Sequence, residues 1–292
     1  MSIQWYPGHM TKARRELASV IPAQDVIIEV LDARLPAASE NPVVTELRGQ
    51  KPCIKVLTKS DLADPQVTAA WLRHYAAAPG RVAAFASTTD RHAETRTRIV
   101  AMCEQLGIHP RQHKPVRAVI AGSPNVGKST LINTLMNRVV ANVGDKPAVT
   151  KGQQQVVLAS GMVIADTPGI LWPDIEDELT GLKLGLGGMI PDTAIDYLTV
   201  AMFGAELFLT RYPALLMARF NLREAPTTAE GLLAGIGRRR GCLQSGGSID
   251  LHKASGILVH EFRSGSLGRI SLEEPAGHGA GRVGGHSEPP AA

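Results

Sequence analysis

The sequence predicts an α/β fold, in which a doubly wound and mostly parallel sheet is followed by a small all-helical domain. Short apolar runs alternate with helical repeats up to about residue 166, as in sheets whose parallel strands are joined by helices. Beyond about residue 176, helical spacing continues while strand-like runs become scarce. We therefore expect an α/β domain over residues 1–174 and a helical domain over residues 175–273. Residues 274–292 are mostly small or polar and predict a disordered tail.

A basic, amphipathic helix opens the α/β domain. Met10, Leu17 and Ile21 recur at helical intervals until Pro22 ends the helix, while basic residues occupy its other faces. Packing of this helix against the domain is the simpler interpretation, and direct contact with RNA is the alternative.

Several short segments have the apolar and β-branched composition of buried strands. They cover residues 25–31, 52–57, 82–85, 116–121 and 162–165. Because ligands of such sheets bind at the carboxyl ends of the strands, we look for site residues just after these segments.

Residues 122–129 (Gly-Ser-Pro-Asn-Val-Gly-Lys-Ser) have the pattern of a phosphate-binding P-loop. Gly122 and Gly127 would let backbone N–H groups approach an anion at the start of the helix that follows. Lys128 would place its charge on the β- and γ-phosphates, and the Ser129 hydroxyl would ligate Mg²⁺. The motif alone can arise by chance, but the strand before it and the helical spacing after it argue against that. The residues expected to touch the nucleotide here are Asn125, Val126, Gly127, Lys128, Ser129 and Thr130.

Two downstream elements would complete the phosphate and metal site. Residues 166–169 (Asp-Thr-Pro-Gly) follow a predicted strand, so that Asp166 would support the metal through water and the Gly169 N–H would sense the γ-phosphate. Thr150 lies in a loop that could bring a ligand onto Mg²⁺ only while γ-phosphate is present. By itself, each of these elements is weak, and Thr150 alone would be an ordinary loop residue.

Residues 58–61 (Thr-Lys-Ser-Asp) have the pattern of a guanine-reading loop. The Asp61 carboxylate can accept two hydrogen bonds from guanine, one from N1–H and one from the N2 amino group, and adenine has no such pair of donors. Ala86 and Ser87 match a second loop that contacts guanine. An exposed turn would explain residues 58–61 equally well if they stood alone, so the prediction depends on the strand before them and on the P-loop.

The guanine-reading loop precedes the P-loop, which reverses the order of ordinary GTPases and indicates a circular permutation. Further motifs occur at residues 5–10 (Trp-Tyr-Pro-Gly-His-Met), 32–36 (Asp-Ala-Arg-Leu-Pro) and 262–271. With these motifs the chain resembles the circularly permuted ribosome-biogenesis GTPase A family, the YlqF type. The resemblance implies a P-loop GTPase sheet in permuted order, GTP or GDP with Mg²⁺ as ligands, and a role late in large ribosomal subunit assembly. It also implies that the partner is a precursor of that subunit, through its rRNA and ribosomal proteins.

Catalysis needs a group that replaces the glutamine of Ras-like enzymes, because Ile170 occupies that position and cannot orient water. His9 is the leading candidate, since it can accept a proton near pH 7 and matches the histidine to which the resemblance attributes catalysis. The alternative is a structural histidine that fixes the first helix. We therefore expect His9, Lys128 and Thr150 to serve catalysis.

Asn125 suggests a monovalent cation. The resemblance to potassium-dependent relatives implies that an asparagine at this point of the loop binds K⁺. The ion would stabilise charge on the phosphates, as an arginine finger does. The alternative is that Asn125 only tolerates a tight backbone.

Composition limits the location of the protein and its contacts with RNA. The 31 Lys and Arg residues exceed the 27 Asp and Glu residues by only +4, so any contact with RNA must be local. Cys53, Cys103 and Cys242 lack the spacing of metal ligands or disulfides, which suits a reducing cytoplasm. The sequence has neither an apolar signal stretch nor a run long enough to span a membrane. We expect a cytoplasmic monomer without a membrane partner.

The helical domain contains one basic cluster, at residues 238–240 (Arg-Arg-Arg), which would end a helix. The cluster could complement the helix dipole or contact rRNA phosphates, and the sequence does not separate these. Thr227 with Glu230 predicts a capping box, and Asp250 predicts a second N-cap. Two features depart from the family pattern: Ala148 replaces a glycine, and glycines at residues 185–188 predict a mobile start of the domain.

Two other functions remain as alternatives. One is a P-loop ATPase or small-molecule kinase, which the guanine-reading loop disfavours. The other is an RNA-binding scaffold that uses nucleotide only as a structural ligand.

Overall fold

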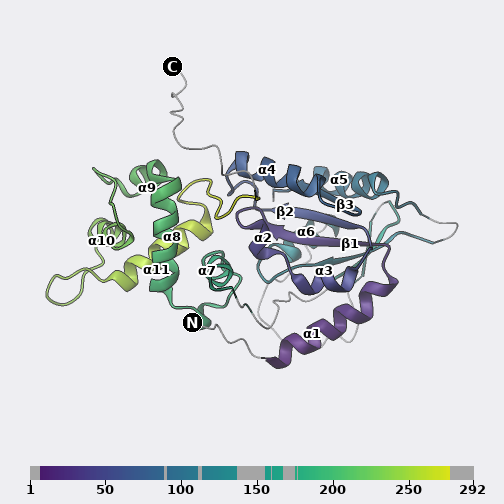
Figure 1. Ribbon diagram of the computed structural model, residues 1–292, viewed down its shortest axis with the longest axis horizontal. Helices are drawn as coiled ribbons and strands as arrows, with labels where there is room; N and C mark the ends of the chain where they lie inside the picture. Colours follow the sequence, from purple (N-terminus) through teal and green to yellow (C-terminus); the bar gives the residue numbers. More distant parts are fainter. Residues whose placement is uncertain are drawn as a thin grey trace, which may run out of the picture.

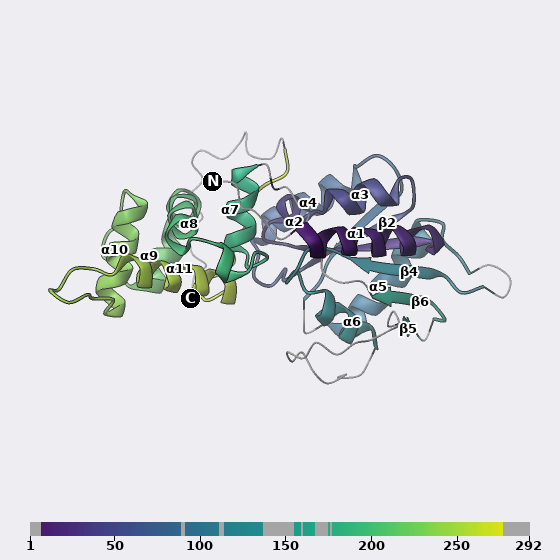
Figure 2. The ribbon, with the colours of Figure 1, turned by 90° about the horizontal axis from the view of Figure 1, so that it is seen from below.

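The computed structural model describes residues 7–88, 91–110, 114–136, 155–158, 160–166, 175 and 177–276, without the side chains of residues 7–13, 92, 155, 156 and 166. Figures 1 and 2 show two parts side by side: a sheet with helices around it, and a group of helices beyond one end of the sheet. The predicted α/β fold with a helical companion is confirmed. The domain limits that we drew remain a proposal.

The sheet has six strands in the order β3-β2-β1-β4-β6-β5. The strands are β1 (Val26–Asp32), β2 (Cys53–Thr58), β3 (Val82–Ala86), β4 (Arg117–Ala121), β5 (Gln155–Val157) and β6 (Val163–Asp166). Every neighbouring pair is parallel except β5 with β6. Each segment that was expected to be a strand is one, whereas the short edge strand β5 has no counterpart in the expectations.

Helices cover both faces of the sheet, which is why β1 and β2 are buried along their whole length. In this part the helices are α1 (Pro7–Val20), α2 (Pro36–Ser39), α3 (Pro42–Arg48), α4 (Pro65–Ala76), α5 (His92–Gln105) and α6 (Lys128–Met136), and a 3₁₀ turn, Ile21–Ala23, follows α1. On one face, Leu17 of α1 and Val44 of α3 share a cluster with Ile27 of β1. On the other face, Ile99 of α5 and Leu131 of α6 belong to the cluster of the neighbouring β1 residues. The sheet is therefore doubly wound.

The helical part consists of α7 (Glu178–Leu186), α8 (Tyr197–Arg211), α9 (Pro213–Phe220), α10 (Ala229–Arg240) and α11 (Leu251–Ser264), with a 3₁₀ turn, Asp192–Ala194. Helix α8 lies at its centre and packs against the other four. The rings of Phe208 and Phe262 meet here, with centroids 5.4 Å apart. Among the described helices, none is long and apolar enough by itself to cross a membrane; α8 and α9 pass that test only as a pair, bent by 110°.

After α11 the chain comes back to the α/β part through residues 270–275, which we call the return segment. The Leu272 N–H donates to the Arg34 carbonyl oxygen at 2.7 Å, and Trp71 Nε1 donates to the Glu273 carbonyl oxygen at 3.2 Å. The Glu273 carboxylate accepts hydrogen bonds from the Ala38 N–H and from Lys183 Nζ, at 2.9 and 2.8 Å. The helical part is thus attached to the α/β part at both of its ends.

One predicted helix cap is wrong by one residue. The hydroxyl of Thr228, not that of Thr227, accepts the N–H of Gly231 at the start of α10. Two adjacent threonines offer the same chemistry, and only the backbone angles decide which one caps the helix. The predicted cap by Asp250 on α11 is confirmed, since its carboxylate accepts the Lys253 N–H at 3.0 Å.

The glycines at residues 185–188 lie where the two parts meet. A Cβ on Gly187 would lie 3.2 Å from the Leu35 side chain, and one on Gly188, whose φ is +77°, would lie 3.1 Å from Arg263 Nε. Close packing and a left-handed backbone therefore account for the glycine content of this turn.

Candidate nucleotide site

The P-loop connects the end of β4 to the start of α6, at the edge of the sheet that faces the helical part. Gly122 has a φ of +152°, and a Cβ there would lie 2.5 Å from the Val30 carbonyl oxygen. Gly127 has a φ of +105°, and its Cβ would lie 3.4 Å from Thr58 Oγ1. Both positions therefore need glycine, so that the loop can run close to β1 and to the guanine-reading loop.

The last two residues of the P-loop, Lys128 and Ser129, begin the first turn of α6. Lys128 is buried, and its Nζ donates to the Ser123 carbonyl oxygen at 2.6 Å, so the charge lies over the loop. Ser129 and Thr130 are exposed in the same turn. A helix N-terminus with a lysine and exposed hydroxyls is suited to an anion that carries a divalent cation.

The guanine-reading loop contacts the P-loop directly. Lys59 has a φ of +54°, and its Nζ donates to the Asn125 carbonyl oxygen at 2.8 Å and to Asp32 Oδ2 at 2.9 Å. The Thr58 hydroxyl lies 2.9 Å from the Leu31 carbonyl oxygen and also contacts the Val126 carbonyl oxygen. Two segments that are remote in the chain are thus held together at one edge of the sheet.

The second guanine loop lies beside the first. Ser60 Oγ donates to the Ser87 carbonyl oxygen at 3.1 Å, and Ser87 Oγ lies 2.9 Å from Thr95 Oγ1. Ala86 ends β3, and Asp61 is exposed. Between these loops and α6 is a hollow that combines the predicted guanine and phosphate residues. Its walls are Thr58, Lys59, Ser87, Thr88, Gly127, Thr130, Leu131 and Thr134.

Asp32 is the residue at this edge to which we assigned no role from the sequence. Its buried carboxylate accepts hydrogen bonds from Arg34 Nε and Nη2, at 3.0 and 2.8 Å, and from Lys59 Nζ. Burial by itself raises the pKa of Asp32, but the charges of Arg34 and Lys59 outweigh it and hold the pKa well below its usual range. The sequence could have indicated a role at the site for Asp32, because Asp32 ends β1 beside Thr58, which ends β2.

Several predicted site residues lie partly or wholly outside the described residues. Thr150 and Gly169 are outside them, and Asp166 is described only as the backbone end of β6. His9 lies in the first turn of α1, and its side chain is outside the description. Figures 1 and 2 show α1 beginning toward the end of the sheet that faces the helical part. Helix α1 therefore begins toward the same end of the sheet as the P-loop.

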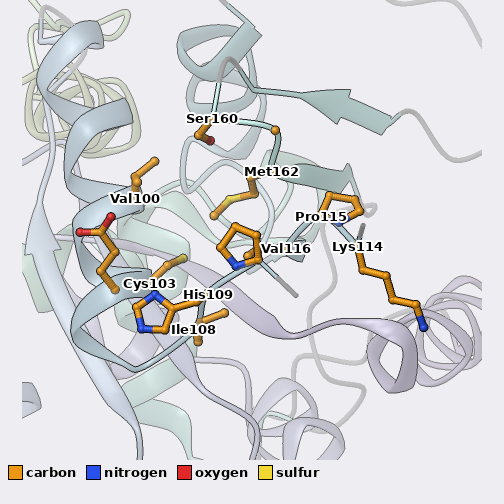
Figure 3. Close-up of a pocket in the computed structure, with 12 residues that line it drawn as sticks. Val100, Cys103, Ile108, His109, Lys114, Pro115, Val116, Ser160 and Met162 are labelled. Carbon is orange, nitrogen blue, oxygen red and sulfur yellow. The ribbon is translucent and has the colours of Figure 1, made fainter. Parts of the chain in front are cut away.

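A second hollow lies at the opposite end of the strands (Figure 3). Val100 and Cys103 of α5, Val116 and Met162 line it together with His109, and burial raises the pKa of the Cys103 thiol to about 11. None of the predicted site residues whose side chains the structure describes lines this second hollow. The hollow at the carboxyl ends of the strands is therefore the candidate site.

No group of three or more His, Cys, Asp and Glu side chains is placed to hold a metal ion in the described part of the chain. The predicted Mg²⁺ ligands are instead a hydroxyl at Ser129 together with Thr150 and Asp166, whose side chains are not described. The exposed Ser129 hydroxyl at the helix N-terminus fits the metal of a bound nucleotide, which brings phosphate oxygens as further ligands.

A P-loop and a guanine-reading loop that meet in reversed chain order define a circularly permuted GTPase. The model of the family described as 50S ribosome-binding GTPase matches residues 117–189. Ribosome biogenesis GTPase A of Bacillus cereus is 41% identical over 286 residues, which cover 94% of this chain and 95% of that protein. The chain belongs to the ribosome biogenesis GTPase A family, and it is a GTPase.

Two solved structures are similar in fold and sequence. The GDP-bound structure of YlqF from Thermotoga maritima has a TM-score of 0.64 and 27% identity, with 89% of this chain and 99% of that chain covered. The GNP-bound structure of the same protein has a TM-score of 0.64 and 28% identity, with 91% and 99% covered. The similarity includes the helical part. Both solved structures contain a bound nucleotide, and this chain is a nucleotide-binding protein like them.

Proposed function

We propose that this GTPase is an assembly factor that binds a maturing large ribosomal subunit in the GTP state and leaves after hydrolysis. The observation that carries the proposal is the similarity to ribosome biogenesis GTPase A along 94% of the chain. The description of the matching family model, 50S ribosome-binding GTPase, supports the large subunit as the partner. In this role the enzyme works as a timer, acting in the cytoplasm as a monomer.

Each part of the nucleotide has a proposed recognition group. Asp61 selects guanine, with Ser60, Ala86 and Ser87 beside the base. Lys128 neutralises the β- and γ-phosphates, and Gly169 senses the γ-phosphate. The support for this assignment is that Lys59 and Ser87 of the two guanine loops and Gly127 of the P-loop line one hollow.

Mg²⁺ and K⁺ are proposed as the ions of the site. Ser129 and Thr150 hold Mg²⁺ in the closed state, and Asp166 supports it through water. Asn125 is the proposed K⁺ ligand, and it is exposed at the P-loop with a φ of +55°. Hydrolysis compared in K⁺ and Na⁺ at equal ionic strength tests the second ion, and equal rates would remove it from the proposal.

His9 is the proposed catalytic group that replaces a glutamine at Ile170. We expect His9→Ala to lower turnover stimulated by ribosomal subunits, with little change in the Kd for GTP. His109→Ala is the matched control, because His109 lies at the opposite end of the strands. An unchanged saturated turnover in His9→Ala would assign His9 to structure alone.

The helical domain, residues 175–273, is the proposed RNA-binding part, with residues 1–174 as the GTPase domain and 274–292 as a tail. Arg238 and Arg239 are exposed at the end of α10, whereas Arg240 pairs with Glu261 at 2.7 Å. The first two arginines are therefore the better candidates for phosphate contacts.

Co-sedimentation with immature and mature large subunits tests the proposed function. We expect binding to immature particles with a non-hydrolysable GTP analogue and release with GDP. Binding that does not depend on the nucleotide would contradict the timer and favour an RNA-binding scaffold.

A further inference from the structure

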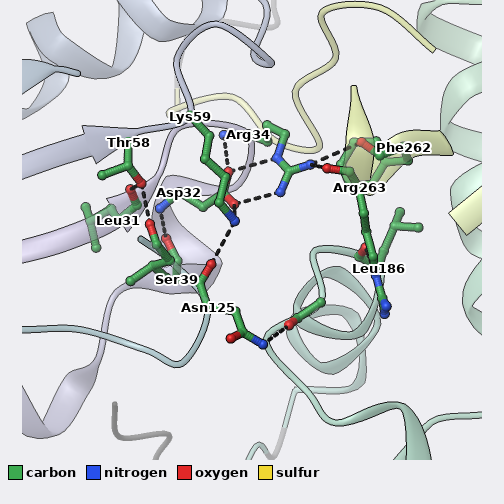
Figure 4. Close-up of polar contacts among 12 residues, drawn as sticks. Leu31, Asp32, Arg34, Ser39, Thr58, Lys59, Asn125, Leu186, Phe262 and Arg263 are labelled. Carbon is green, nitrogen blue, oxygen red and sulfur yellow. Dashed lines mark hydrogen bonds and ion pairs between the residues drawn. The ribbon is translucent and has the colours of Figure 1, made fainter. Parts of the chain in front are cut away.

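Polar contacts link each of the two nucleotide loops to the helical part, and Figure 4 shows those that pass through Lys59 and Asn125. Arg269 Nη2 also donates directly to the Ser60 carbonyl oxygen, at 3.1 Å. The first link starts at Lys59, whose Nζ bonds Asp32, and continues through the hydrogen bonds of Asp32 with Arg34. Arg34 Nη1 then donates to the carbonyl oxygen of Phe262 at 3.1 Å, near the end of α11. The guanine-reading loop is thus joined to α11 through two buried side chains.

The second link starts at the P-loop. Asn125 Nδ2 donates to the Gly188 carbonyl oxygen at 2.7 Å, just after α7. The two links meet on the helical side, because Arg263 Nε and Nη2 donate to the carbonyl oxygens of Leu186 and Gly185, at 3.2 and 2.7 Å. They also meet on the nucleotide side, where Lys59 bonds the Asn125 carbonyl oxygen. The contacts form a closed ring, which we call the interdomain ring.

Arg34 is the member of the ring for which another residue is least able to substitute. Its side chain is 1% exposed, its guanidinium donates to both carboxylate oxygens of Asp32, and its Cζ lies 4.7 Å from the centroid of the Phe262 ring. A planar fork of this kind fixes direction as well as charge, which a lysine does not do.

The ring also holds strained backbone in place. Lys59 and Asn125 have φ values of +54° and +55°, in the left-handed region that non-glycine residues seldom adopt. Such conformations persist where the surroundings impose them. Both residues lie in the nucleotide loops, and each is held by a contact that leads to the helical part.

We propose that Arg34 is a positioning residue for nucleotide binding, which links the shape of the guanine-reading loop and the P-loop to the docking of helices α7–α11. By thermodynamic reciprocity, docking of the helices raises nucleotide affinity, and bound nucleotide tightens docking. The inference depends only on nucleotide binding. Its failure would leave the proposed role in ribosome assembly untouched.

The test compares Arg34→Lys and Arg34→Met with Arg219→Met. Arg219 makes a similar forked pair with Glu261, at 2.8 and 3.0 Å, but within the helical part. We expect the Kd of a fluorescent GDP analogue to rise about tenfold in both Arg34 variants, within the usual 5- to 150-fold range of coupling, and to stay unchanged in Arg219→Met. Arg34→Lys keeps a charge beside Asp32, so it preserves the fold if Arg34→Met does not.

Hydrogen exchange supplies a readout that a purely structural role would not move. We expect GDP to slow exchange at the Leu272 amide, which bonds the Arg34 carbonyl oxygen, in the wild type and in Arg219→Met. In Arg34→Lys this effect of GDP should be lost. An unchanged Kd in Arg34→Lys, or exchange that is faster but still slowed by GDP, would overturn the proposal.

Discussion

Two clusters of arginine and carboxylate side chains in this protein have the same chemistry but different surroundings. At the nucleotide edge, the side chains of Asp32 and Arg34 are 0% and 1% exposed. In the helical part, Glu261 is 11% exposed, while its partners Arg219 and Arg240 are 39% and 38% exposed. Water can replace a lost partner in the second cluster but not in the first. The loss of stability caused by a substitution should therefore depend on how deeply the cluster is buried, because both clusters pair arginine with a carboxylate.

The largest effect is expected for Asp32→Ala. This change leaves the Arg34 guanidinium buried without its carboxylate, and breaking a buried pair from one side costs about 3–5 kcal/mol. Urea unfolding followed by circular dichroism measures the difference. A loss below about 1 kcal/mol, the range of exposed pairs, would remove the contrast between the clusters.

A pair of glycine substitutions sharpens the same contrast in packing. In Gly122→Ala the new Cβ meets the Val30 carbonyl oxygen, so we expect a loss of about 1–3 kcal/mol from overpacking, together with weaker GTP binding. In Gly256→Ala, within α11, the new Cβ meets nothing within 4 Å, so we expect a gain of about 0.5–1 kcal/mol and unchanged GTP binding. Thermal unfolding and nucleotide titration of both variants measure these effects. Unfolding midpoints that shift in the same direction in the two variants would contradict this prediction.

The pH dependence of stability should also identify the buried cluster. The pKa of Asp32 is lower in the folded state than in the unfolded state, so the contribution of Asp32 is complete above an unfolded pKa of about 3.9 and declines as pH falls below it. The difference in unfolding free energy between wild type and Asp32→Asn should therefore shrink below about pH 4. Parallel curves down to low pH would refute this assignment.

The smallest effect is expected for Glu261→Gln. Its two arginine partners reach water, so the unfolding midpoint should move much less than in Asp32→Ala, and nucleotide affinity should not change. Thermal unfolding with and without GDP measures both. A shift as large as that of Asp32→Ala would mean that exposure does not separate the clusters.

Much of the fold and part of the candidate site follow from local pattern. Strand ends of a parallel sheet lie at one edge, so Thr58 and Gly122 could be placed together from the order of apolar runs. Strand β5 escaped prediction because it has only three residues and its Val157 is 68% exposed, which gives no buried run to detect. The cap at Thr228 escaped because its neighbour is also a threonine.

The interdomain contacts could not be predicted, because no periodicity connects their members. Arg34 and Phe262 are separated by 228 positions, and the bond is made by a backbone carbonyl, which every residue possesses. Asn125 drew attention as a cation ligand, yet its amide nitrogen contacts Gly188, and the type of residue at position 188 does not reveal such an acceptor. Contacts with backbone acceptors depend on tertiary geometry alone.

The return segment lowers the affinity that the contacts between the helices and the α/β part need for stable docking. Helices α7–α11 form a closed loop of chain, because the chain leaves the sheet after β6 and is fastened again where Leu272 bonds Arg34 and Trp71 bonds Glu273. Contacts within such a loop form at an effective concentration set by the tethers, on the order of millimolar for short ones. Contacts that are individually weak are then enough to keep helices α7–α11 docked on the α/β part. If the contacts of one loop with the helices break, the helices remain joined to the sheet through the chain, so the contacts can form again without a diffusional search.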